Sequence, residues 1–180
     1  WDLFEAECCF PTAQSLATAE PAISLGLLGT PAQAWLGDPI ATFNFALFAL
    51  TWIAAIAMYA LVRSWTRSPA AALVAALLYA FHALRISDAS HVYVYDTGWI
   101  VLALLFASRL FESGHWRDAI ALSLCGVLQM AESFYPLLAA VLIAIPFALW
   151  AALRYGLRNV RPAQLGLVAV GQIQTPTEPG

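Results

Sequence analysis

The feature that most constrains this chain is a run of apolar stretches between Pro39 and Tyr155. The first of them, residues 39–62, contains no charged side chain. A helix that crosses the hydrocarbon core of a bilayer needs about 20 predominantly apolar residues, so this stretch is long enough to span a membrane. Four more apolar stretches follow it, at about residues 69–84, 97–110, 119–130 and 136–153.

The composition supports a membrane protein. Hydrophobic residues make up 62% of the chain and charged residues 11%, whereas about a quarter of the residues of a soluble domain are charged. The pattern therefore predicts an all-α fold: a polytopic transmembrane helix bundle of about five spans, preceded by an exoplasmic loop with interfacial helices. A net charge of −3 without a basic stripe argues against nucleic acid as a partner. The three cysteines have neither zinc-site spacing nor a disulfide framework.

Three segments are expected along the chain. Residues 1–38 form an acidic segment that Pro11, Pro21 and Pro31 break into short pieces, and we expect interfacial helices at residues 22–28 and 31–36. Residues 39–161 hold the transmembrane bundle. Residues 162–180 are too short and too rich in proline to cross, so we expect a truncated span or a disordered tail there. Because neither an initiator Met nor a signal peptide precedes the first residue, we expect a fragment of a longer protein.

The arginines predict the orientation. Short cytoplasmic loops collect Arg, and most of the arginines fall in three regions that lie on one side of the predicted bundle: Arg63 and Arg67, Arg109 and Arg117, and Arg154, Arg158 and Arg161. We assign that side to the cytoplasm, which makes the N-terminal segment exoplasmic in a multi-pass protein of the inner (cytoplasmic) membrane.

The opposite side gathers several carboxylates together with His91 and Arg85, and part of this set lies in the polar interval of residues 85–96. Arg85 follows an apolar helix on the side where Arg is disfavoured, which indicates a specific anionic partner. Asp38 and Asp96 precede predicted helices, so we interpret them as N-caps, and Glu132 as a residue that caps or flanks a helix. For Glu5, Glu7 and Glu20, catalysis and plain solvation remain equally good interpretations.

Several short motifs also resemble bacterial GT-C-type membrane glycosyltransferases. They are the order Leu3-Phe4-Glu5-Ala6-Glu7-Cys8-Cys9-Phe10-Pro11, then Ala19-Glu20-Pro21, Gly29-Thr30-Pro31, Tyr59-Ala60-Leu61-Val62-Arg63, the alanine-rich stretch 70–81, Arg85, His91 and residues 114–119. In that family an acidic residue of the first exoplasmic loop is the catalytic base, and the sugar donor is usually linked to a polyprenyl phosphate.

The resemblance implies that Glu5 or Glu7 deprotonates a glycan or lipid acceptor while Arg85 holds the phosphate of the lipid-linked sugar. His91, Glu20 and Asp88 are then further candidates for substrate binding. Some family members need a divalent cation, which is the one cofactor that the resemblance leaves open. Two other classes fit the composition, namely a non-catalytic assembly subunit and a polytopic transporter, although a transporter would need more polar groups near the middle of the bilayer.

Overall fold

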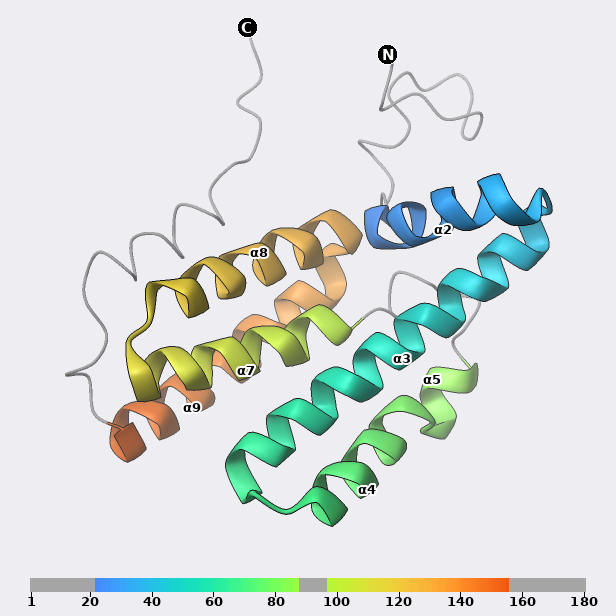
Figure 1. The fold of residues 1–180 in the computed structure, drawn as a ribbon. Helices are drawn as coiled ribbons and strands as arrows, with labels where there is room; N and C mark the ends of the chain where they lie inside the picture. The colour runs from blue at the N-terminus through green and yellow to red at the C-terminus, as the bar shows by residue number, and fades with distance from the viewer. Residues whose placement is uncertain (1–21, 88–96, 156–180) are drawn as a thin grey trace, which may run out of the picture.

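The computed structural model describes residues 22–87 and 97–155, and the described parts of the chain are helical apart from short connections (Figure 1). The predicted all-α class is therefore confirmed for those residues. The helices are α2 (Ile23–Leu36), α3 (Pro39–Thr66), α4 (Pro69–Ala80), α5 (Ala83–Ser87), α7 (Gly98–Ser113), α8 (Trp116–Glu132) and α9 (Phe134–Tyr155).

Two helices begin where the sequence places a capping residue before a proline. The Asp38 carboxylate accepts a hydrogen bond from the Ile40 amide at 3.0 Å, and the Ser68 hydroxyl accepts one from the Ala71 amide at 3.3 Å. In both helices Pro occupies the first position, where its missing N–H costs nothing. The prediction that Asp38 is an N-cap is thus confirmed, whereas the N-cap of α7 is Thr97 and Asp96 lies outside the described residues.

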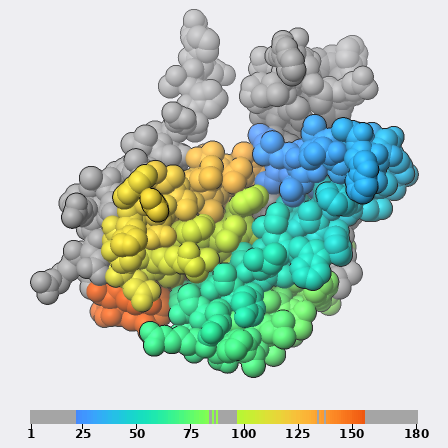
Figure 2. All heavy atoms as spheres, viewed as in Figure 1, coloured from blue at the N-terminus to red at the C-terminus, as the bar shows by residue number. Residues whose placement is uncertain are grey.

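Very short connections join the long helices. Arg67 and Ser68 join α3 to α4, Gly114 and His115 join α7 to α8, and Ser133 joins α8 to α9. Consecutive helices therefore reverse direction, and α3 packs against α4, α7 against α8, and α3 against α7. Figure 2 shows α8, α7, α3 and α4 following one another across one face of the molecule.

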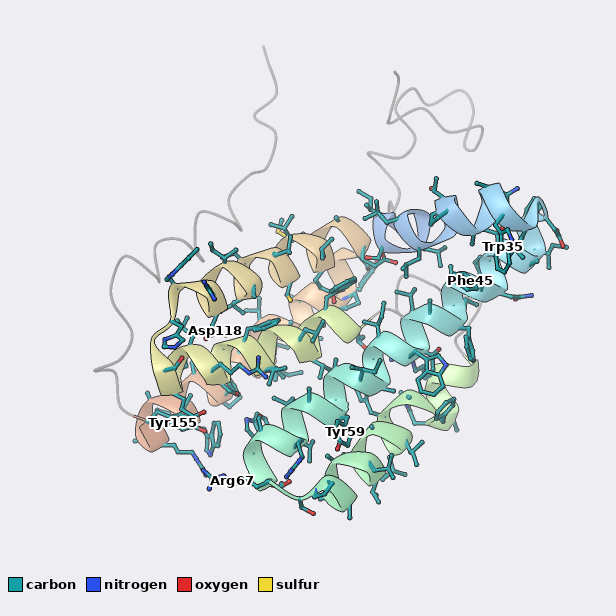
Figure 3. All side chains as sticks on the ribbon, viewed as in Figure 1. Trp35, Phe45, Tyr59, Arg67, Asp118 and Tyr155 are labelled. Atoms are coloured by element: carbon teal, nitrogen blue, oxygen red, sulfur yellow. The ribbon has the colours of Figure 1, made fainter. Side chains whose placement is uncertain are left out.

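The bundle has two chemically different ends. At one end lie the C-terminal ends of α3, α7 and α9 and the first turn of α8. We call it the arginine end, because it carries Arg63, Arg67, Arg109, Arg117 and Arg154. The other is the α2 end, where α2 lies beside the start of α3 and the end of α8. Figure 3 shows Arg67 and Tyr155 at the first end and Trp35 and Phe45 at the second.

The packing is the reverse of that in a soluble bundle. The buried apolar positions are mostly alanine, including Ala46, Ala54 and Ala57 of α3, whereas the large side chains Phe48 and Trp52 are 61% and 51% exposed. Small residues between helices and large apolar residues outside suit a bundle surrounded by lipid. A contiguous apolar exterior of this kind marks a surface that is covered by something other than water.

Two helical segments are long and apolar enough to cross a membrane, namely Pro39–Thr66 and Leu138–Tyr155. They support membrane association. The other predicted spans are also helices, but α4, α7 and α8 have 12, 16 and 17 residues and are short for a crossing. Five crossings therefore stay a prediction.

The helices α3, α7, α8 and α9 extend a few residues beyond the predicted stretches, and α2 and α4 differ from the prediction in kind. Instead of two short pieces, α2 is one helix that continues through Pro31. Contacts with α3 compensate for the proline: buried Gly29 lies close to Thr42, and the Thr42 hydroxyl donates to the Gln33 side chain at 2.7 Å. The second difference is that α4 ends at Ala80, where the ring of His82 lies 2.9 Å from the Tyr79 carbonyl and can satisfy a group that the helix end leaves open.

Candidate functional site

The structure describes one of the predicted site residues. Arg85 belongs to α5, whereas Glu5, Glu7, Glu20, Asp88 and His91 lie outside the described residues. The candidate site is therefore described from Arg85 and its surroundings at the α2 end of the bundle.

Arg85 is a buried guanidinium, only 5% exposed. Its Nη1 donates to the Thr97 hydroxyl at 3.2 Å, and its Cζ lies 5.7 Å from the centre of the Tyr79 ring. The same Thr97 hydroxyl is 2.6 Å from the Tyr79 hydroxyl. The end of α4 and the start of α7 thus hold the guanidinium in a fixed place, through a hydrogen bond and a cation–π contact.

A second buried ionisable side chain lies at the same end of the bundle. Glu132, the last residue of α8, is fully buried, and its Oε2 accepts a hydrogen bond from the Ser24 amide at 2.7 Å. Ser24 is in the first turn of α2, so this carboxylate caps a helix that is 108 residues away in sequence. A carboxylate also interacts favourably with the positive end of the helix dipole.

Trp99 completes this junction. Its indole Nε1 donates a hydrogen bond to the Ser24 hydroxyl at 2.9 Å. Ser24 is therefore hydrogen-bonded to Glu132 of α8 through its backbone amide and to Trp99 of α7 through its side chain. Because Thr97 and Trp99 are two residues apart, the first turn of α7 contacts both the Arg85 cluster and the Glu132 junction. The α2 end therefore contains a buried arginine and a buried glutamate, each held by residues from other helices.

Of these two side chains, the Arg85 guanidinium is the one whose chemistry suits an anion. A guanidinium forms strong, directional hydrogen bonds with phosphate or carboxylate oxygens. Within residues 22–87 and 97–155, no group of three or more His, Cys, Asp or Glu side chains is placed to hold a metal ion.

Sequence reasoning missed part of this site. Glu132 was predicted to cap or flank a helix, and it does cap one, but the capped helix is α2 and not a neighbour in sequence. Ser24 and Trp99 were not singled out as partners. A signal existed for Ser24, because Ser followed by apolar residues after Pro21 is typical of a helix start, but nothing local points to a carboxylate 108 residues later.

Comparisons with protein-family models, with curated protein sequences and with solved structures found no match to this chain.

Proposed function

We propose that this chain belongs to a multi-pass inner-membrane protein that transfers a sugar from a polyprenyl-phosphate donor to a glycan or lipid acceptor on the exoplasmic face. The observation that carries the proposal is the position of Arg85. It is buried at the α2 end, whereas the other described arginines gather at the opposite end. An arginine that departs from the distribution expected of cytoplasmic loops favours a role in binding an anion.

In this mechanism Arg85 neutralises the phosphate that leaves the anomeric carbon of the sugar. Thr97 and Tyr79 are positioning residues, because they fix the guanidinium before the substrate arrives. Preorganised charge at the place where charge develops is a large source of rate enhancement. Glu5 or Glu7 supplies the base that takes the proton of the acceptor hydroxyl. The helices α3, α4, α7, α8 and α9 are the five proposed crossings, and α2 lies in the interface where the lipid-linked donor arrives.

The test is sugar transfer in membrane vesicles that contain the whole protein, with a radiolabelled sugar on polyprenyl phosphate. We expect Arg85→Ala to lower transfer at least 100-fold and Arg85→Lys to lower it less, because lysine keeps the charge. The matched control is Arg63→Ala, an exposed arginine at the other end, which should retain transfer. Full transfer in Arg85→Ala would contradict the proposal.

The base is tested separately. We expect one of the two variants Glu5→Gln and Glu7→Gln to lose transfer while the donor still binds, because the amide cannot accept the proton. If both variants keep full transfer, neither glutamate is the base.

A further inference from the structure

Helices α7, α8 and α9 line a half-open apolar cavity of about 260 Å³. It exists because small residues face one another across the three helices: Ala103 and Ala107 from α7, Gly126 from α8, and Ala140 and Ala144 from α9. An apolar cavity of about 150 Å³ stays free of water and accepts apolar ligands. A larger cavity with this lining therefore selects a hydrocarbon occupant.

The length and volume of the cavity indicate which kind of hydrocarbon molecule fits in it. Its lining on α7 extends from Trp99 to Phe111, which at the rise of an α-helix is about 18 Å. A volume of about 260 Å³ spread over that length suits one narrow chain. It is also below the range of about 300–1,000 Å³ that is usual for pockets of drug-sized ligands.

The two extremities of the cavity differ in polarity. Trp99 and Gln129 lie at the extremity nearer the α2 end, and Phe111 lies at the other. No charged side chain is among the lining residues. A molecule with a polar head and a long apolar tail is therefore oriented, with its head toward the α2 end.

The surroundings of α9 identify the source of that chain. The outer face of α9 is apolar and exposed, with Leu142 and Leu149 at 67% and 64% exposure, and Leu138–Tyr155 is long enough to cross a membrane. In a bilayer this face lies against lipid tails, so acyl chains are the apolar molecules at highest concentration beside the cavity. We propose that the cavity binds one acyl chain of a bilayer phospholipid, whose head group lies beside Gln129 and Trp99.

The first test uses the whole chain in nanodiscs that contain phosphatidylcholine with a diazirine in the middle of one acyl chain. After irradiation, mass spectrometry maps the labelled residues. We expect Ala103, Ala107 and Gly126 to be labelled at least as strongly as Leu142 and Leu149 of the outer face. Label confined to the outer face, or cross-links through these residues between two copies of the chain, would overturn the proposal.

Filling the cavity gives a matched pair of variants. Ala144→Phe places a ring in the cavity and should lower the label on Ala103 and Ala107 at least tenfold. Ala71→Phe makes the same change on the exposed surface of α4 and should leave that label unchanged. Equal labelling in the two variants would contradict the proposal.

Discussion

Glu132 connects two parts of the chain that are far apart in sequence through one short hydrogen bond. Its buried carboxylate accepts from the Ser24 amide, and the Ser24 hydroxyl accepts from Trp99. A hydrogen bond to a charged group contributes about 1.5–3 kcal/mol, and a buried N–H that loses its acceptor costs about 1–3 kcal/mol. The start of α2 should therefore depend on this one side chain.

We expect Glu132→Ala to lower the free energy of unfolding by about 1–3 kcal/mol, because the buried Ser24 amide loses its acceptor. Glu132→Gln keeps an oxygen in that place and should cost less. The measurements are thermal unfolding in detergent and hydrogen exchange of the Ser24 amide, which should become faster. Glu112→Ala removes an exposed carboxylate from α7 and serves as the control. Unchanged exchange at Ser24 would show that the bond does not form.

Thr97 has a similar role for Arg85. Its hydroxyl contacts both Tyr79 and the Arg85 guanidinium. Thr97→Val should therefore destabilise the protein by about 1–3 kcal/mol, whereas Thr97→Ser keeps the hydroxyl and should cost much less. A double-mutant cycle with Tyr79→Phe measures the coupling directly. Additive effects of the two substitutions would mean that the two hydroxyl groups do not interact.

At the scale of elements, α2 offers two glycines with opposite roles. Gly37 follows the helix with a φ of +67°, a left-handed conformation that strains any residue with a Cβ. Gly26 lies inside the helix, and a Cβ there would meet no atom within 4 Å.

The same substitution at the two glycines should therefore have opposite signs. We expect Gly37→Ala to lower the free energy of unfolding by about 1–2 kcal/mol. Gly26→Ala should raise it by about 0.5–1 kcal/mol, because alanine favours the helix and lowers the conformational entropy of the unfolded chain. Thermal unfolding of the two variants in one detergent measures the difference, and an equal shift in both would contradict the assigned conformations.

The sequence predicted the helices better than their ends. Apolar stretches and the prolines at 39 and 69 identified α3 and α4 because both signals are local. Pro31 misled the prediction, since contacts between α2 and α3 outweigh the missing N–H, and such contacts are not visible in a short window. The bond between Ser24 and Glu132 was unpredictable for the same reason, whereas Arg85 was found because its charge conflicts with its apolar neighbourhood.

At the scale of the whole molecule, the separation of arginines defines the orientation that we propose. Single cysteines at Arg67 and His115, in a chain without its own cysteines, should react with a membrane-impermeant maleimide only when it is added from the cytoplasmic side. Cysteines at Asp38 and His82 should react only from the exoplasmic side. The first pair is assigned to the cytoplasmic side because it lies at the arginine end, and positive residues favour cytoplasmic loops. Reaction of all four from one side would rule out the crossings.

The one-residue and two-residue connections between the long helices also bear on how the protein is made. Helices joined by Arg67 and Ser68, or by Gly114 and His115, are partners in space as soon as both have been synthesised. Closing so short a loop costs little chain entropy, and contacts between sequence neighbours form early. The pairs α3–α4 and α7–α8 are therefore expected to enter the bilayer as preformed hairpins. The junction of Glu132 with Ser24 joins α8 to α2, so it is expected to form only after the α7–α8 hairpin has been synthesised.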